Sequence, residues 1–487
     1  MPFVAPHIAW HGIAPELALV GGALVALLID AVKPAVDRRF LAGLSLATIG
    51  LAAWFTFDLR DTRAVIMQGT LAVDGVALFG RLILLITAAM TILISYHYLS
   101  RRRIHRGEYY PLLLLATSGM TLLAASNDLL LSFLAIETLS LALYVMVGFA
   151  RRDEKSQEGA LKYFLLGAFS SAFLLYGIAL TYGATGSTQL SVISKQAAVA
   201  SVDERLMFVA VAMIAVGFAF KVAAVPFHMW SPDAYQGAPT SVTGFMAAGT
   251  KAAAFIGFFR VFLVAFGALQ WDWRPVLWIV AVATMAVGSL LAIAQTDVKR
   301  MLAYSSIAHA GYVLIGLVAA NRDGVSAALF YLLIYAVMVL GAFAAVIVSA
   351  PGGSERLSLA EWGGIGRRYP VFGGAMTLFL LALAGLPPTS GFTGKFLLFA
   401  AAIKAHENAL VVAATITSVV AAFFYVRLIV LIWLQDPPPD DGHPGIGPTP
   451  ALITSLGIAA AATIVFGVWP QSLIDLARNA ISHGFVG

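Results

Sequence analysis

Five ionisable side chains lie near the middle of long apolar segments, where charged groups are rare. They are Glu137, Lys221, Lys251, His309 and Lys395. A charge at the centre of a lipid bilayer costs roughly 3 kcal/mol on insertion scales, so such a residue persists only where it faces a partner or water. Glutamate, lysine and histidine can each accept and donate a proton. A row of these groups with water between them predicts a path for protons through a membrane protein.

A buried glutamate beside a buried lysine could act as a switch. Burial disfavours the charged form of both side chains, whereas pairing favours it. Joined, the two groups hold their charges; separated, the lysine tends to release its proton. Neighbouring hydroxyl groups could hold water beside these charges, and the sequence places them at Thr138, Ser140, Thr250, Ser305 and Ser306.

A structural role is the alternative at each of these positions, because buried polar side chains also join helices inside membranes. This alternative stays open for Glu137 and above all for His309, since a lone histidine often serves packing. Lys221 lies five residues before a proline that interrupts its segment. Lysine is a poor structural choice at mid-span, so Lys251 and Lys395 favour a functional role.

Four further basic residues lie toward the ends of apolar segments. A long basic side chain there can reach the lipid headgroups while its stem stays in the apolar layer. This snorkelling accounts for Arg81, Lys162, Arg260 and Arg427. Lys162 is kept as a candidate site residue, because it could line a cytoplasmic entrance to the proton path.

The composition requires lipid as the solvent of this chain. Of its 487 residues, 60% are hydrophobic and 11% are charged, and the mean hydropathy is +0.89; soluble domains average roughly a quarter charged residues. Cysteine is absent, which excludes thiolate iron–sulfur clusters, c-type haem and thiolate zinc sites. The sequence also lacks a GxxxxGK[ST] loop and a GxGxxG loop after a strand. We therefore expect no cofactor and no metal in this chain.

Fourteen segments are long and apolar enough to cross a membrane, since a spanning helix needs about 20 such residues. We predict an all-α polytopic membrane protein with these 14 transmembrane helices, followed by a short amphipathic surface helix at 471–483. The predicted spans lie near 14–32, 40–57, 74–98, 109–125, 128–148, 160–182, 206–226, 240–263, 275–295, 300–319, 325–348, 371–400, 409–433 and 450–469.

Proline interrupts two of the predicted spans. The seventh contains Pro226, and the twelfth contains AGLPPTSGFTGK at 384–395. Lipid tolerates such breaks only where protein or a water-filled cavity satisfies the freed backbone groups. Breaks in corresponding positions are typical of inverted repeats, so we expect spans 4–8 and 9–13 to form two inverted five-helix repeats. The expected parts of the chain are 1–107, 108–265, 266–435 and 436–487.

The loops between the predicted spans differ in charge. Odd-numbered loops carry fifteen lysine and arginine residues, and the loops and ends on the opposite side carry eight. Because basic loops remain in the cytoplasm, we expect the odd loops there and both termini in the periplasm. The net charge of +5 thus indicates topology and not a nucleic-acid partner.

Four stretches of sequence together resemble one protein family, the proton-conducting, antiporter-like membrane subunits of complex I. The resemblance extends over essentially the whole chain. The four stretches are DLLLSFLAIETLSLALYVM at 128–146, EGALKYFLLGAFSSAFLLYG at 158–177, GFAFKVAAVPFHMWSPDAYQGAP at 217–239 and AGLPPTSGFTGKFLLF at 384–399.

The resemblance implies a polar axis in the plane of the membrane. Glu137 would pair with Lys221, and Lys251 would connect through His309 and water to Lys395 as the exit-side residue. Quinone reduction elsewhere in the complex would drive the charge changes. The implied partners are the other complex I membrane subunits, of types A, H, J, K, L and M, in the bilayer of a bacterial plasma membrane. NADH, FMN, iron–sulfur clusters and quinone would bind to partner subunits.

Three features favour the branch of this family called subunit N. The twelfth span carries Lys395 where other branches usually carry glutamate, the eighth span begins TSVTGFMAAG without a His-Ala-Ala stretch, and no long lateral helix follows the fourteenth span. The loop 436–448 is expected to vary. The alternatives are a subunit of an Mrp-type cation/proton antiporter, a related membrane-bound complex with a non-NADH donor, and an assembly subunit with vestigial polar residues.

Overall fold

Helices dominate the computed structural model, which describes residues 9–198, 203–349, 355–436 and 447–485. Within these ranges, twelve helical segments are long and apolar enough to cross a membrane, and two shorter apolar helices, Tyr109–Ala125 and Pro370–Ala384, accompany them. The prediction of an all-α, multi-pass membrane protein is confirmed. The count of fourteen spans stays a prediction, and the extreme termini and most of the loop 436–448 lie outside the described residues.

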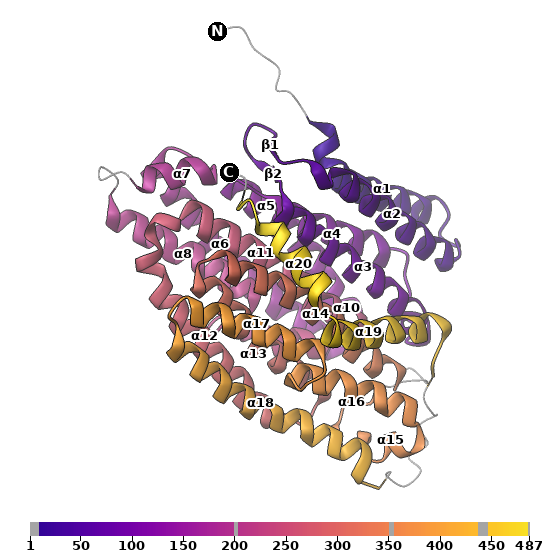
Figure 1. Cartoon of the computed structure of the whole chain (residues 1–487). Helices are drawn as coiled ribbons and strands as arrows, with labels where there is room; N and C mark the ends of the chain where they lie inside the picture. Colours follow the sequence, from indigo (N-terminus) through magenta and orange to yellow (C-terminus); the bar gives the residue numbers. More distant parts are fainter. Residues whose placement is uncertain (1–8, 199–202, 350–354, 437–446, 486–487) are drawn as a thin grey trace.

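Three long helices and a small hairpin form one flank of the molecule (Figure 1). α1 (Ala14–Val32) follows the 3-10 turn η1 (Trp10–Ile13), and α2 (Arg38–Asp58) and α3 (Gly75–Arg101) come next. After the 3-10 turn η2 (Leu59–Asp61), the strands β1 (Ala64–Ile66) and β2 (Leu71–Val73) pair antiparallel, with Val65 opposite Ala72. Many large apolar side chains of α1 and α2 are exposed, as suits helices that face lipid.

The first interrupted span lies among the next eight helices. Two wide π-helical turns, Met246–Thr250 and Val261–Ala265, flank α11 and join it to α10 in one buried span. The bounds are α4 (Tyr109–Ala125), α5 (Leu129–Val147), α6 (Glu154–Thr185), α7 (Leu190–Ala197), α8 (Glu204–Val222), α9 (Trp230–Gly237), α10 (Thr240–Phe245) and α11 (Lys251–Arg260).

The break after α8 lies where the proline predicts it. α8 ends at Val222, and the chain leaves the helix at Ala223, whose φ of 58° is left-handed. Pro226 follows and has no N–H with which to continue the helical hydrogen bonds. The indole N–H of Trp230 donates to the carbonyl of Phe220, 2.9 Å away. A protein group thus reaches the open end of the helix, as an apolar surrounding requires.

The second interrupted span consists of α16 and α17, with left-handed Gly385 (φ 85°) after α16. Both breaks contain a cis X–Pro bond, at Val225–Pro226 and Pro387–Pro388. α13 and α14 run through the interior and are buried almost throughout. The bounds of this part are η5 (Gly267–Leu269), α12 (Gln270–Ile293), α13 (Val298–Ala319), α14 (Arg322–Val348), η6 (Leu359–Trp362), α15 (Ile365–Arg368), α16 (Pro370–Ala384), α17 (Ser390–Lys404) and α18 (Asn408–Leu434).

The last two helices close the chain. α19 (Pro450–Val468) is a spanning helix, and α20 (Gln471–Ile481) lies across α3 and α14 (Figure 1). α20 buries Leu473 and Ala477 and exposes its polar side, which confirms the predicted surface helix at 471–483.

Every predicted span coincides with a helical segment of the described chain. The largest difference is α6, which begins at Glu154, six residues before the predicted start at 160. The hairpin and the short helices α7, α9 and α15 were not predicted. The inverted relation between the two five-helix units stays a prediction.

Candidate functional site

The three mid-span lysines all point into the helix bundle. Lys221, Lys251 and Lys395 are 2%, 2% and 5% exposed, and His309 is 2% exposed. They come from α8, α11, α17 and α13, and each makes hydrogen bonds inside the protein. None of the four reaches toward lipid headgroups, so all meet the first condition for an internal proton path.

Lys221 binds to a hydroxyl group of α5. Its Nζ donates to Ser140 Oγ over 2.7 Å, and Ser140 donates onward to the carbonyl of Ile136. Glu137 lies on the same face of α5, one turn before Ser140, and accepts a hydrogen bond from Ser171 of α6. The Glu137 carboxylate attracts Lys221 electrostatically, but no ion pair within 4.0 Å joins the two described groups. Their direct pairing stays a prediction, and Ser140 holds the amine here.

Aromatic rings enclose the rest of the Lys221 amine. Nζ lies 5.8 Å from the ring centre of Tyr144 and 5.6 Å from that of Phe220, within the range of cation–π attraction. Tyr144 packs edge-on against Tyr163, and Tyr163 stacks on Trp230, with ring centres 4.7 Å and 4.4 Å apart. This aromatic wall connects the lysine to α9 beyond the break.

Lys251 binds to the backbone of α13. Its Nζ donates to the carbonyl oxygen of Ser306. Lys251 is the first residue of α11 and directly follows the π-helical turn Met246–Thr250; such turns frequently mark functional positions. The ion pairs among the described residues include none with Lys251, so a carbonyl dipole, and not a carboxylate, faces this amine.

His309 bridges two tyrosines from different helices. Its Nδ1 lies 2.6 Å from the hydroxyl of Tyr331 on α14, and its Nε2 lies 3.0 Å from the hydroxyl of Tyr425 on α18. Tyr425 also shares a hydrogen bond with Ser305. A neutral imidazole donates through one nitrogen and accepts through the other, so this line of groups can pass a proton in either direction. The same contacts would also serve packing, the alternative left open above.

Lys395 closes the gap in the broken span. Its Nζ donates to the carbonyl of Ala384 over 2.9 Å and to Ser418 Oγ of α18 over 2.8 Å, and it lies 4.7 Å from the ring centre of Tyr312. Ala384 is the last residue of α16, and the helical partner of its carbonyl would be Pro388, which has no N–H. The lysine therefore takes the place of that missing donor. Tyr312 lies on α13, almost one turn after His309, and brings Lys395 next to the histidine.

Buried hydroxyl groups without a protein partner follow the same row of helices. In an ordinary interior such groups are satisfied by protein or by ordered water, so a strip lined with them has the chemistry that retains water. Within the described ranges, Tyr163 and Thr250 are such groups.

Lys162 belongs to a cluster at the edge of the bundle. Its Nζ contacts Asp233 of α9 at 2.7 Å and Glu158 at 2.6 Å, and Arg300 binds the other oxygen of Asp233 at 2.5 Å. Burial alone would raise the pKa of Asp233, but the hydrogen bonds from Lys162 and Arg300 outweigh burial and hold that pKa below its ordinary value of 3.8. Sequence reasoning missed Asp233 and Arg300, although Asp233 lies just seven residues after Pro226.

Two arginines contradict the snorkelling interpretation. Arg81 is fully buried and binds both oxygens of Glu16, at 2.9 and 3.0 Å. Arg260 is also fully buried and binds both oxygens of Asp74, at 2.8 and 2.7 Å. The prediction was wrong because each arginine finds a carboxylate on another helix or at its cap, and a two-pronged pair of this kind withstands burial. Lys162 binds carboxylates too, whereas Arg427 donates to the Ile293 carbonyl at 3.1 Å.

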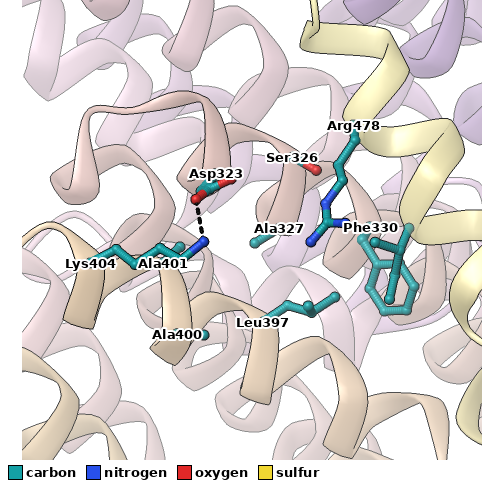
Figure 2. Close-up of a pocket in the computed structure, with 10 residues that line it drawn as sticks. Asp323, Ser326, Ala327, Phe330, Leu397, Ala400, Ala401, Lys404 and Arg478 are labelled. Atoms are coloured by element: carbon teal, nitrogen blue, oxygen red, sulfur yellow. Dashed lines mark hydrogen bonds and ion pairs between the residues drawn. The ribbon is translucent and has the colours of Figure 1, made fainter.

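A small cavity of about 60 Å³ lies where α20 covers the ends of α14 and α17 (Figure 2). Asp323 and Lys404 form an ion pair of 2.8 Å at its edge, and Arg478 of α20 points toward it. This volume holds a few water molecules at about 10–15 Å³ each. Lys404 and Lys395 are nine residues apart on α17 and therefore face opposite sides of that helix, so the cavity does not contact the Lys395 amine.

The chain is similar to a family of membrane proteins over most of its length. The family described as "NADH:quinone oxidoreductase/Mrp antiporter, TM" matches residues 126–421. NADH-quinone oxidoreductase subunit N of Parafrankia sp. (strain EAN1pec) is 44% identical, with 99% of this chain and 96% of that protein covered. The subunit N of Trichlorobacter lovleyi is 40% identical, with 96% of each chain covered.

Solved structures share the arrangement of helices. A chain of respiratory complex I from Thermus thermophilus has a TM-score of 0.81 and 34% identity, with 95% of this chain and 99% of that chain covered. A chain of the Mrp complex from Dietzia sp. has a TM-score of 0.83 at 23% identity, with 97% of each chain covered. The second likeness is one of fold alone.

Proposed function

The chain belongs to the NADH:quinone oxidoreductase/Mrp antiporter membrane family, and we propose that it is a proton-translocating membrane subunit of NADH:quinone oxidoreductase. Within that complex, the chain would be subunit N, as its relatives are. The observation that carries this proposal is the set of three lysine amines buried inside the bundle at 2–5% exposure, each hydrogen-bonded to protein. Burying three amines in a membrane protein is costly, and proton transfer gives each of them a use.

The proposed path begins at two half-buried groups, Lys162 and Glu137, and continues along the four buried ones. Lys162 stands at the cytoplasmic edge, the pair of Glu137 and Lys221 receives the proton, Lys251 and His309 carry it through the middle, and Lys395 releases it toward the outside. These assignments rest on the placement of the side chains described above and on the family resemblance. Lys251, His309 and Lys395 meet around α13, which supports a continuous second half of the path.

The contacts of the lysines suit groups that change their charge. A carbonyl or hydroxyl oxygen accepts a hydrogen bond from an ammonium group and from a neutral amine alike. The bonds of Lys251 and Lys395 to backbone carbonyls therefore persist whether or not the proton is present. A carboxylate in the same place would hold the ammonium form by its charge.

The finer assignments of topology and partners belong to the same proposal. We place the odd loops in the bacterial cytoplasm and both termini in the periplasm, and we divide the chain into residues 1–107, 108–265, 266–435 and 436–487. The described residues include no group of three or more His, Cys, Asp or Glu side chains that could hold a metal ion. NADH, FMN, iron–sulfur clusters and quinone would bind to partner subunits, and membrane subunits of types A, H, J, K, L and M would adjoin this chain.

Substitution of Glu137 or of Lys221 tests the proposal. In the assembled complex, Lys221→Ala or Glu137→Ala is expected to abolish most proton pumping by inverted membrane vesicles, because the proton-accepting pair is lost. Lys195→Ala, an exposed lysine on α7, is the control and should pump normally. Normal pumping by either site variant, with the complex intact, would contradict the proposal.

Purification distinguishes the rival, an Mrp-type cation/proton antiporter subunit. An affinity tag on this chain, used in mild detergent, should bring down subunits that carry flavin and iron–sulfur clusters and that oxidise NADH. Recovery of antiporter subunits without NADH oxidation would favour the rival. Recovery of a redox module that does not accept electrons from NADH would favour a complex with another donor.

A further inference from the structure

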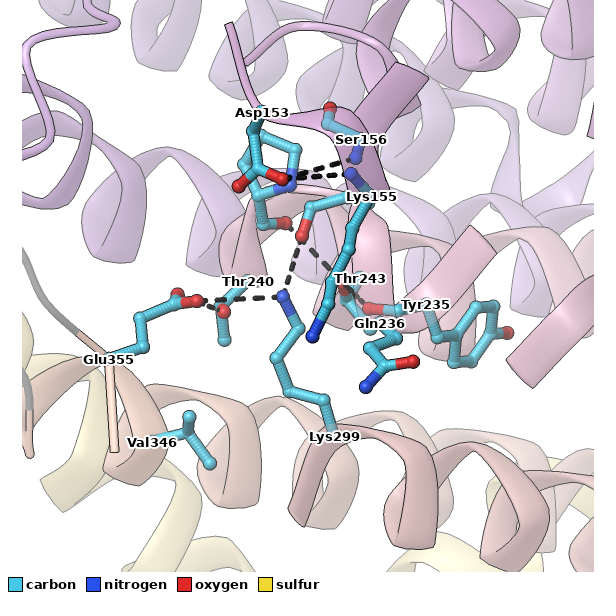
Figure 3. Close-up of polar contacts among 12 residues, drawn as sticks. Asp153, Lys155, Ser156, Tyr235, Gln236, Thr240, Thr243, Lys299, Val346 and Glu355 are labelled. Atoms are coloured by element: carbon cyan, nitrogen blue, oxygen red, sulfur yellow. Dashed lines mark hydrogen bonds and ion pairs between the residues drawn. The ribbon is translucent and has the colours of Figure 1, made fainter. Parts of the chain in front are cut away.

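A buried carboxylate, that of Glu355, faces Thr240 and Lys299 and has no bond to the three central lysines among the described contacts (Figure 3). The side chain of Glu355 is 3% exposed, and one of its oxygens accepts hydrogen bonds from the hydroxyls of Tyr98, at 2.6 Å, and Thr240. Its other oxygen pairs with Arg102 at 2.9 Å and with Lys299 at 3.7 Å. These partners come from the ends of α3, α10 and α13, so the carboxylate joins three parts of the chain.

Of these groups, Lys299 is the one that can exchange a proton, because its nearest acceptor is a backbone carbonyl at 2.7 Å and the Glu355 carboxylate lies farther away, at 3.7 Å. Burial alone would raise the pKa of Glu355, but the charges of Lys299 and Arg102 and the hydrogen bond from Thr240 outweigh burial and lower it. Glu355 therefore stays ionised, and arginine does not release its proton in proteins. The Lys299 amine is nearly inaccessible, at 2% exposure, and also donates to the carbonyl of Ala238 over 2.7 Å.

Four charged side chains act on the Lys299 amine from the surrounding segments: Glu355, Arg102, Asp297 and Asp153. Three are acidic and one is basic. Nearby negative charge attracts cations, so this surrounding favours the arrival of a proton from water.

A cavity connects Lys299 to the surface. Its volume is about 360 Å³, and its lining includes Asp153, Lys155, Gln236, Lys299 and Glu355. Lys155 is exposed, so the cavity reaches the face that carries the basic loops. The volume accommodates many water molecules at about 10–15 Å³ each, and polar side chains line it. Water can therefore approach the Lys299 amine from the proposed cytoplasmic side.

Lys299 lies on α13, the same helix that provides the acceptor of Lys251. Lys299 and Ser306 are seven residues apart on α13, which places them on one face about 10 Å apart. The Ser306 carbonyl is the acceptor of Lys251, and the Ser306 hydroxyl is buried beside it. On the opposing span, the Thr240 hydroxyl donates to Glu355, and the same span continues through Thr243 to Lys251. Hydroxyl groups therefore lie at both ends of this interval, at Thr240 beside Glu355 and at Ser306 beside the central lysine.

We propose that Lys299 is a proton-uptake site for the second half of the path, at which a proton from cytoplasmic water is loaded before it passes to Lys251. Glu355 is a positioning residue that keeps the amine at the cavity by its fixed negative charge. This inference rests on the proposed function, and it adds an intake separate from the cluster of Lys162 and Asp233. The competing explanation is a purely structural ion pair, called the clasp below, in which Lys299 and Glu355 hold neighbouring chain segments together and exchange no proton.

Two substitutions at one position separate uptake from a clasp. Lys299→Arg keeps the positive charge and the ion pair but cannot give up its proton, whereas Lys299→Ala removes both. In the intact complex, both variants should slow proton pumping in inverted vesicles by roughly 10²-fold, as expected when a proton-transferring group is removed. Normal pumping by Lys299→Arg would overturn the proposal and leave the clasp.

Chemical rescue adds a measurement whose result would not change if Lys299 had only a structural role. Methylamine supplied to inverted vesicles can enter the cavity, and it should restore part of the pumping by Lys299→Ala but none by Lys299→Arg. The restored rate should follow the unprotonated fraction of methylamine as the pH is raised. Absence of rescue in an assembled Lys299→Ala complex would count against uptake at this site. If Lys299→Ala does not assemble, the Arg variant alone decides.

The controls distinguish this inference from the function on which it rests. Lys221→Ala is measured in parallel, and Lys195→Ala serves as the unaffected variant. Loss of pumping by Lys221→Ala together with normal pumping by Lys299→Arg would overturn only the uptake site. Normal pumping by Lys221→Ala would instead overturn the proposed function itself.

Discussion

The two interrupted spans hold their lysines in different ways. At the first break, the indole of Trp230 occupies a carbonyl at the end of α8, and Lys221 is left to bind the Ser140 hydroxyl. At the second break, Lys395 itself binds the last carbonyl of α16, at Ala384. Lys221 therefore makes no hydrogen bond to the end of a broken helix in the described structure, whereas Lys395 does.

The charges around the two lysines differ as well. Glu137 attracts Lys221, while the ion pairs of the described residues include none with Lys395, which faces oxygen dipoles and the ring of Tyr312. The comparison teaches that two proline breaks can hold a buried lysine by different contacts. The first lysine lies in the field of a carboxylate, and the second is bonded to the end of a helix.

Removal of each lysine should give the largest effects. It tests whether Lys395, unlike Lys221, also stabilises the end of a helix. Lys221→Ala and Lys395→Ala should both lose most proton pumping in the assembled complex. Lys395→Ala should also lower stability by about 1–3 kcal/mol, because the Ala384 carbonyl is left buried without a donor. Thermal unfolding of the two purified complexes measures this difference. An equal loss of thermal stability in both variants would show that the contact with Ala384 is unimportant.

A carboxylate placed beside Lys395 should make the second half resemble the first. Ser418→Asp puts a negative charge near the amine, and an opposite charge within about 4–6 Å favours the charged amine by roughly 1–4 kcal/mol. Because the proton is then held, pumping should slow by roughly tenfold or more. Ser418→Asn is the matched uncharged variant and should pump much faster. Equal rates for Asp and Asn would refute control by charge.

Deletion of the two serine hydroxyls should give smaller and unequal effects. Ser140→Ala removes the described hydrogen bond of Lys221, whereas Ser418→Ala leaves Lys395 with its bond to Ala384. A neutral hydrogen bond contributes about 1 kcal/mol, so Ser140→Ala should slow pumping a few-fold and Ser418→Ala less. Initial pumping rates of the two variants provide the test, and a larger loss in Ser418→Ala would reverse the expected order.

The smallest effect concerns stability at the first break. The pKa of Asp233 is held below 3.8 after folding, so its ion pairs stabilise the protein above that pH and cease to do so as the pH falls through the lowered value. Asp233→Asn should therefore reduce stability near neutral pH by no more than about 1 kcal/mol. The difference should vanish in acid, as measured by unfolding temperature against pH. A difference that grows in acid would have the wrong sign.

The sequence predicts the spans, both breaks and the burial of the lysines, because these depend on local composition. Apolar length defines the spans, proline defines the breaks, and the cost of a mid-span charge forces Lys251 and Lys395 inward. The hydrogen-bond acceptors of these lysines were not predictable. They are the backbone carbonyls of Ser306 and Ala384, and every residue type carries a carbonyl, so no letter of the sequence marks them.

The position of a basic residue in the sequence does not reveal its ion-pair partner. In the sequence, Lys299 and Arg102 are two of the fifteen basic residues of the odd-numbered loops, and the position of Arg81 toward the end of a span suggests snorkelling. Each meets a carboxylate that lies far away in the sequence: Glu355 for the first two and Glu16 for Arg81. Such pairs depend on which helix ends are adjacent in three dimensions, and composition does not contain that information.

The π-helical turns on either side of α11 separate it from the rest of its span, and the two ends of α11 are held by different numbers of side-chain hydrogen bonds. Lys251 and Arg260 stand at the two ends of this ten-residue segment and, nine residues apart, point to opposite sides. Two hydrogen bonds to Asp74 clamp the Arg260 end, while a single carbonyl bond restrains the Lys251 end. A rotation of this segment would therefore have to break two side-chain hydrogen bonds at Arg260 but only one at Lys251.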